Sequence, residues 1–131
     1  MKILLLGKNG LLGNSLHRIL SETEEVFATS KEECDILNPE AIKRAIMTFN
    51  PEVIINATGY TKVDLAEDNG EWPALYAINA YALDFLSRIC KKTSTVLVHF
   101  STDYVFDGKA KSGYKESSIR SPLNEYGSSK A

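Results

Sequence analysis

The feature that most constrains the fold is a glycine-rich loop between a short apolar run and an amphipathic stretch. The loop, Gly7-Lys8-Asn9-Gly10-Leu11-Leu12-Gly13, directly follows the apolar run 2–6, and apolar residues then recur at helical spacing through 11–20. In a strand–loop–helix unit, three such glycines permit a tight turn, the approach of a pyrophosphate and close helix packing. The free N–H groups at the helix N-terminus attract phosphate. The loop therefore predicts a dinucleotide-binding site.

Apolar runs and amphipathic stretches alternate along the rest of the chain. We expect strands at 2–6, 26–29, 53–55 and 95–100, and helices at 11–20, from Asn38-Pro39 to Pro51, and at 72–92. This order predicts the α/β class, a Rossmann-like doubly wound parallel sheet with its ligand site at the carboxyl ends of the strands. Residues 1–131 are expected to be one NAD(P)-binding domain.

The end of the sequence has a different character. Residues 107–121 are polar and rich in Gly, Ser and Lys, which is typical of a surface loop, and 122–131 begins another helical pattern that stops after about two turns, too short for an isolated helix. We expect an N-terminal piece of a longer protein, without the later strands and the substrate-binding part.

Composition excludes several partner classes. The net charge is -2, which offers no basic excess for a nucleic-acid backbone or an anionic membrane, and the apolar run 3–6 is far too short to span a bilayer. With no signal-peptide layout, we expect a cytoplasmic protein whose two cysteines, Cys34 and Cys90, stay reduced. No metal-ligand spacing is present, so no metal site is expected in these residues.

The end of the second strand bears on the choice of cofactor. Ser30 and Lys31 stand where NAD-binding proteins tend to carry an acid, and a hydroxyl and an ammonium suit a 2′-phosphate better. Glu32 and Glu33 follow and weaken that preference, so the sequence favours NADPH and leaves NADH open. Asp35-Ile36 is expected at the adenine edge, and a solvated turn is an equal alternative for Asp35.

Hydroxyl and amino groups in the second half of the chain suggest reductive chemistry. Tyr126 and Lys130 are four residues apart and share a helix face, where the ammonium would lower the pKa of the phenol. Such a tyrosine can donate a proton to a carbonyl oxygen as hydride reaches its carbon. Thr102, after the fourth strand, could bond the same oxygen, or simply cap the strand end. The small residues of 56–61 would let the backbone run beside the cofactor, with a plain loop as the alternative.

These motifs together resemble a known family. The opening run through Gly13 and the segments 56–67, 101–108 and 121–130 resemble the extended short-chain dehydrogenase/reductase superfamily and, within it, the dTDP-4-dehydrorhamnose reductases. Ser-Thr-Asp-Tyr-Val-Phe at 101–106 is the most specific string. Related dehydratases carry a glutamate where Tyr104 stands, which favours reduction without dehydration.

The resemblance implies a function and a set of site residues. Family members reduce the 4-keto group of a dTDP-6-deoxyhexulose to dTDP-L-rhamnose, so a nucleotide-sugar substrate is implied. Members are often dimers and some use Mg²⁺ through a later part of the chain, which leaves a homodimer and Mg²⁺ open for a full-length form. The implied catalytic residues are Thr102, Tyr126 and Lys130, and Thr102 and Asp103 approach the sugar. The expected cofactor-binding residues are Gly7, Gly10, Leu11, Leu12, Gly13, Ser30, Lys31, Asp35, Ile36, Gly59, Tyr60, Thr61, Phe100, Tyr126 and Lys130.

Two rival functions share this pattern. The chain also resembles the non-catalytic, NADP-binding regulatory subunit of methionine adenosyltransferase, and more weakly the sugar-nucleotide epimerases. Retention of Thr102, Tyr126 and Lys130 favours an enzyme. Because family members are more than twice as long, we expect these 131 residues alone to be catalytically silent.

Overall fold

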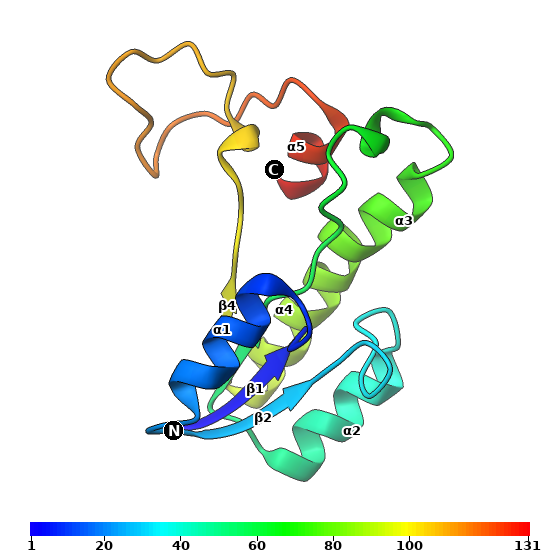
Figure 1. Ribbon diagram of the computed structural model, residues 1–131, viewed down its shortest axis with the longest axis vertical. Coiled ribbons are helices and arrows are strands. Elements are labelled where there is room, and N and C mark those ends of the chain that lie inside the picture. The colour runs from blue at the N-terminus through cyan, green and yellow to red at the C-terminus, as the bar shows by residue number, and fades with distance from the viewer.

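One parallel sheet organises the protein. In the computed structural model, which describes residues 1–131, the strands β1 (Lys2–Leu6), β2 (Glu25–Thr29), β3 (Val53–Asn56) and β4 (Val96–His99) lie in the order β2-β1-β3-β4 (Figure 1). All neighbouring pairs are parallel, with Leu4 opposite both Phe27 and Ile54. The predicted fold class is confirmed. The fourth strand is shorter than expected, because the chain leaves the sheet after His99.

Helices cover both faces of the sheet, and the alternation of side chains along β1 explains how. Ile3 and Leu5 point to the face covered by α1 (Leu11–Leu20), where they pack with Leu16 and Leu20. Leu4 and Leu6 point to the opposite face, covered by α2 (Pro39–Phe49) and α4 (Ala82–Thr93). A strand buried on both sides reads as a continuous apolar run, which is why the first strand is easily predicted.

The stretch expected to form one regular helix over 72–92 is divided into three parts. The short helix α3 (Trp72–Tyr76) leads into one π-helical turn, η2 (Ala77–Tyr81), and then into α4. The expectation of a regular helix was wrong because this turn accommodates a buried polar side chain, Asn79, which is only 2% exposed. Inserted π-turns of this kind often occur at functional sites.

The remaining elements are short. The 3-10 turns η1 (Leu65–Glu67) and η3 (Asp103–Val105) were not predicted, and the last helix, α5 (Glu125–Lys130), begins three residues later than expected. Its start is set by Asn124, whose side-chain oxygen accepts a hydrogen bond from the backbone N–H of Gly127 at 2.7 Å.

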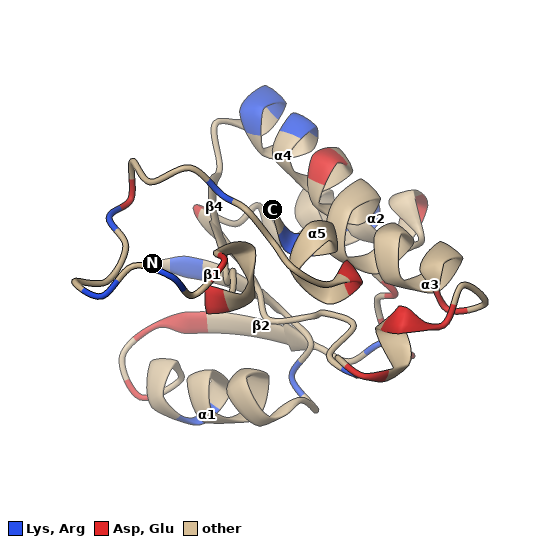
Figure 2. Ribbon diagram, turned by 90° about the horizontal axis from the view of Figure 1, so that it is seen from above, with Lys and Arg blue, Asp and Glu red and all other residues tan.

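The charged residues lie on the surface, and the two cysteines lie in the core. Basic and acidic residues are interspersed over the surface, with Lys91 and Lys92 in the last turn of α4 (Figure 2). Cys34 and Cys90 lie buried in the core under α2 and α4 as free thiols. None of the helices combines the length and apolar character required to cross a membrane.

Candidate functional site

A cleft opens at the carboxyl edge of the sheet, where the strand order reverses. β1 has β2 on one side and β3 on the other, so the loops that follow β1 and β3 diverge there and leave a crevice. The cleft has a volume of about 500 Å³. Its lining brings together four segments that are distant in the sequence, the glycine loop, the loop after β3, the residues after β4 and the α5 helix: Gly10, Leu11, Leu12, Asn56, Ala57, Thr58, Gly59, Thr61, Phe100, Ser101, Tyr126 and Lys130.

The three loop glycines differ in what the fold requires of them. Gly7 has a φ of +91°, which side chains other than hydrogen rarely tolerate. A Cβ on Gly13 would overlap the carbonyl oxygen of Gly7 and lie 2.7 Å from its carbonyl carbon, so α1 can approach β1 only with glycine there. A Cβ on Gly10 would meet nothing closer than the Gly7 oxygen at 3.5 Å. The fold itself therefore does not require glycine at position 10, whose open backbone faces the cleft.

The loop after β3 is fixed by a buried amide. The Asn56 side-chain oxygen accepts hydrogen bonds from the backbone N–H of Thr58 at 3.0 Å and from its hydroxyl at 2.6 Å. The Asn56 amide nitrogen lies 3.2 Å from Nδ1 of His99 and donates to it. This network holds the small residues of the loop against the cleft, which they line.

Tyr126 and Lys130 reach the cleft from α5. The Lys130 ammonium donates to the carbonyl oxygen of Phe100 at 3.0 Å and lies 3.5 Å from Nε2 of His99. Burial lowers the pKa of Lys130 from its usual value. The Tyr126 ring packs edge-on against Tyr104, with 5.7 Å between ring centroids. The predicted helical pair is thus present on the wall of the same cleft as the glycine loop.

Tertiary contacts hold this six-residue helix in place. A Cβ on Gly127 would overlap the carbonyl oxygen of Tyr104, so glycine allows α5 to pack directly on η3. Asn79, in the π-turn, donates to the Ser129 hydroxyl at 2.9 Å and binds both backbone polar groups of Tyr60. One buried amide therefore ties α5 to the segment that follows β3.

Thr102 and Asp103, the residues expected to approach the sugar, lie outside the cleft lining. The Thr102 hydroxyl caps η3 by accepting from the Tyr104 N–H at 3.3 Å and donates to the Asp103 carboxylate at 3.1 Å. Asp103 lines a separate pocket of about 480 Å³ with seven other residues, Tyr104, Phe106, Asp107, Gly108, Tyr114, Leu123 and Asn124. Along the chain, Thr102 lies between Ser101, which lines the cleft, and Asp103, which lines this second pocket.

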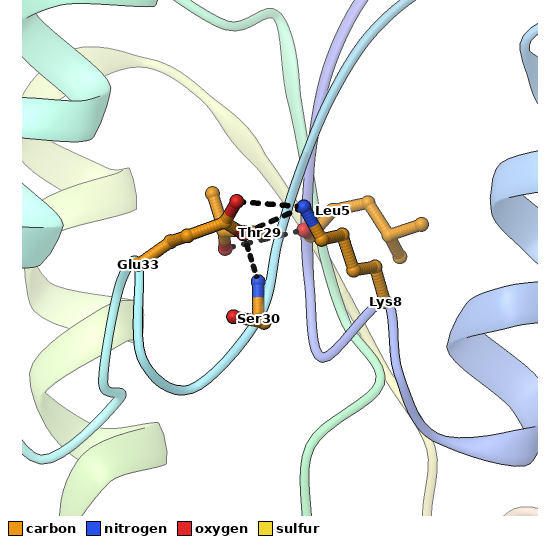
Figure 3. Close-up of polar contacts among 5 residues, drawn as sticks. All are labelled: Leu5, Lys8, Thr29, Ser30 and Glu33. Atoms are coloured by element: carbon orange, nitrogen blue, oxygen red, sulfur yellow. Dashed lines mark hydrogen bonds and ion pairs between the residues drawn. The ribbon is translucent and has the colours of Figure 1, made fainter.

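The predicted residues at the end of β2 occupy different environments. Ser30 is buried, and its backbone N–H donates to the Glu33 carboxylate (Figure 3). The Lys31 side chain is exposed and makes no ion pair. The Asp35 carboxylate accepts from the Leu37 N–H at 2.9 Å, as expected for a turn residue. The Ile36 side chain is buried in the core under α2 and α4.

Tyr60 differs from its two neighbours in the predicted set. Its ring is buried against Ala66 and Leu75, and its hydroxyl donates to Glu71 at 2.7 Å. Burial and the Glu71 carboxylate raise the pKa of Tyr60 to about 12. Its side chain is thus turned away from the cleft, while Gly59 and Thr61 line it.

Several residues that build the site were missed in the sequence. Asn79 and Ser129 lie on helix faces that are otherwise apolar or small, and a polar residue at a core position was the signal available for Asn79. Asn56 and His99 end two neighbouring strands, so their contact follows from the strand order, which the sequence alone does not give. No group of three or more His, Cys, Asp or Glu side chains is placed to hold a metal ion.

Comparison with known proteins identifies the family. A family model described as the RmlD substrate binding domain matches residues 1–131. The chain belongs to this family. Within the RmlD family, it is 40% identical over 130 residues to dTDP-4-dehydrorhamnose reductase of Burkholderia thailandensis, an alignment that covers 99% of this chain and 43% of that protein.

Solved structures agree with the family assignment. The dTDP-4-dehydrorhamnose reductase of Bacillus anthracis, in complex with NADP, superimposes with a TM-score of 0.92 at 35% identity, over 98% of this chain and 46% of that one. A Clostridium acetobutylicum orthologue gives a TM-score of 0.90 at 35% identity, over 99% and 46%. The chain thus spans less than half the length of the relatives it matches, and the resemblance read from its motifs is confirmed.

Proposed function

We propose that this chain is the cofactor-binding part of an NAD(P)H-dependent reductase that acts on the 4-keto group of a dTDP-6-deoxyhexulose. One observation carries the proposal: a single cleft is lined by the open backbone of Gly10 and by Tyr126 and Lys130. A dinucleotide-binding loop alone would serve a regulatory subunit equally well. Because Tyr126 and Lys130 line the same cleft as the loop, we favour a reductase, and the relatives named as reductases support the same activity.

The residues present fit a dinucleotide. Gly10 leaves room for a pyrophosphate. Because Gly10 is the N-cap of α1 and has no side chain to bind the first backbone N–H groups of the helix, these groups are available to the oxygens of the pyrophosphate. When bound, NADPH or NADH supplies the hydride. Gly59 and Thr61 border the cleft beyond β3 and limit its width there, while Phe100 supplies the carbonyl that holds Lys130.

Tyr126 acts as the proton donor. Its phenol gives a proton to the carbonyl oxygen of the sugar as that oxygen gains negative charge. Lys130, four residues further along α5, lies on the same helix face and stabilises the resulting phenolate. Thr102 orients the carbonyl by exchanging its bond to Asp103 for one to the substrate, and Asp103 approaches the sugar from the neighbouring pocket.

The test is a comparison of binding with turnover. NADPH is titrated into the 131-residue chain by fluorescence, and the full reading frame that contains it is assayed with the dTDP-linked 4-keto sugar by the loss of NADPH absorbance. We expect NADPH binding by the 131-residue chain without turnover, turnover by the full reading frame, and its loss in Tyr126→Phe with NADPH affinity retained.

Each failure has a distinct meaning. Turnover by the 131 residues alone would refute the expectation that they are silent. NADPH binding by the full reading frame with no turnover would refute the reductase and favour a regulatory subunit. Interconversion of 4-epimeric sugars without net consumption of NADPH would favour an epimerase.

A further inference from the structure

An ion pair joins the glycine loop to the end of β2. The Lys8 ammonium lies 2.8 Å from one oxygen of the Glu33 carboxylate and 2.7 Å from the other (Figure 3). The backbone N–H of Ser30 donates to the same carboxylate at 2.7 Å. A charged donor and a backbone donor from two different loops thus converge on one anion.

The backbone around these donors is fixed. The N–H groups of Gly7 and Lys8 both donate to the carbonyl oxygen of Thr29, at 2.9 and 3.0 Å, which locks the glycine loop to the last residue of β2. Ser30 is buried, so its N–H has a set direction. Glu33 is different: 53% of its side chain is exposed, and it can swing into solvent without disturbing the core.

The position of the Lys8–Glu33 pair at the end of β2 suggests what it does. In this fold the residue at the end of the second strand approaches the ribose 2′ position of a bound dinucleotide, where a carboxylate suits a hydroxyl and a cation suits a phosphate. Here both kinds of group are present and neutralise each other. Lys31, the cation singled out from the sequence, makes no ion pair and is exposed, whereas Lys8 points directly at the anion site.

We propose that Glu33 is an internal substitute for the 2′-phosphate of NADPH, bound by Lys8 and the Ser30 N–H, and that this pair sets the cofactor preference. NADH leaves the pair intact, with the carboxylate accepting a hydrogen bond from the ribose 2′-hydroxyl. NADPH displaces the Glu33 side chain, and its 2′-phosphate takes over both donors. The inference rests on the proposed function, since it requires that the cleft bind a nicotinamide dinucleotide.

Two substitutions separate the roles of the partners. Glu33→Gln keeps the shape and the acceptor oxygen but removes the charge that repels a phosphate, so the ratio of the NADH to the NADPH dissociation constant should rise by about tenfold or more. Lys8→Met removes the charged donor, and the same ratio should fall by about tenfold or more. Glu32→Gln is the matched control, because Glu32 is the adjacent acid and makes no ion pair; it should leave the ratio within about twofold.

The experiment measures four ligands on each variant by calorimetry at fixed salt: NADPH, NADH, adenosine 2′,5′-bisphosphate and 5′-AMP. The two adenosine nucleotides report the 2′ subsite without the nicotinamide end, and circular dichroism melts show that each variant is folded. Across the variants, we expect the dissociation constant of the bisphosphate to change in the same direction as that of NADPH, and the dissociation constant of 5′-AMP to change in the same direction as that of NADH.

The outcomes separate this inference from the proposed function. If the wild type binds NADPH and NADH but Glu33→Gln and Lys8→Met change their ratio no more than Glu32→Gln does, the selector role is wrong and the dinucleotide site stands. If the folded wild type binds none of the four ligands, both are wrong. If Glu33→Gln weakens the binding of NADPH, the carboxylate does not compete with the 2′-phosphate and the inference is overturned.

Discussion

The contrast between Gly10 and Gly13 makes the sharpest prediction, because the two glycines differ in what the fold demands. Gly10→Ala adds a methyl group that meets nothing closer than 3.5 Å, on a backbone with φ of -74° and ψ of 163° that alanine adopts freely. Alanine is a poorer N-cap than glycine by about 0.5–1 kcal/mol. Replacing glycine by alanine also lowers the conformational entropy of the unfolded chain, which stabilises the folded state by about 0.4–1 kcal/mol. We expect the free energy of unfolding to change by less than about 0.5 kcal/mol.

Gly13→Ala should behave in the opposite way. Its methyl group would overlap the Gly7 carbonyl oxygen, and because that neighbour is backbone, no side-chain rotation relieves the overlap. The higher helix propensity of alanine would stabilise the folded state by about 1 kcal/mol. The forced overpacking of a rigid backbone contact would destabilise it by about 3 kcal/mol or more. A net loss of at least about 2 kcal/mol follows.

The assay pairs urea unfolding with NADPH titration on the same samples. Gly10→Ala should unfold like the wild type but bind NADPH at least about tenfold more weakly, which corresponds to about 1.4 kcal/mol, and Gly10→Val should bind more weakly still. If Gly10→Ala loses as much stability as Gly13→Ala, glycine at position 10 serves the fold. If Gly10→Val binds NADPH as well as the wild type does, the pyrophosphate does not lie over this loop.

Three further substitutions test other parts of the account. Asn79→Ala leaves the backbone N–H and carbonyl of Tyr60 without their side-chain partner, and the Ser129 hydroxyl keeps only its bond to the Tyr126 carbonyl, so urea unfolding should show a loss of about 1–3 kcal/mol. Burial and the neighbouring Lys130 lower the pKa of His99, so the unfolded state binds more protons between that lowered value and about 6.5 and stability rises with pH across this window. Unfolding of His99→Gln should therefore depend less on pH below 6.5, and an unchanged slope would contradict the assignment. Lys31→Glu should reduce any preference for NADPH through its charge, and a wild type that binds NADH more tightly would contradict the preference inferred from the sequence.

The sheet and its glycine loop were predictable because they depend on local patterns. β1 is buried on both faces and α1 on one, so an apolar run followed by helical periodicity specifies both elements and the loop between them. Asn38 and Pro39 mark the start of α2 in the same local way. Such signals depend only on residues a few positions apart.

The parts that the sequence did not reveal depend on contacts between distant residues. The π-turn exists because Asn79 must reach Tyr60 and Ser129, which lie 19 and 50 residues away. The pairing of Lys8 with Glu33 depends on how two loops meet at the edge of the sheet, so the sequence pointed to Lys31 instead. The sequence offered Thr102 only as a strand-end cap besides its site role, and its place as the cap of η3 is visible only once that turn is formed.

The six residues of α5 show how tertiary contacts replace local stability. A helix of this length is not stable by itself, yet Glu125 accepts a hydrogen bond from Tyr76 and its N–H donates to Glu67. Together with Gly127 against η3, these contacts place Tyr126 and Lys130 on the cleft wall.

The central claim is that one bound dinucleotide contacts both the glycine loop and α5, and hydrogen exchange measured by mass spectrometry tests it most directly. Exchange is followed on the 131-residue chain with no ligand, with adenosine 2′,5′-bisphosphate and with NADPH. We predict that the bisphosphate slows exchange in the segments 7–13 and 29–33 alone, and that NADPH slows it there and also in 125–131. Protection of the first two segments by NADPH with no change in 125–131 would contradict the claim that the loop and the Tyr126–Lys130 pair form one site.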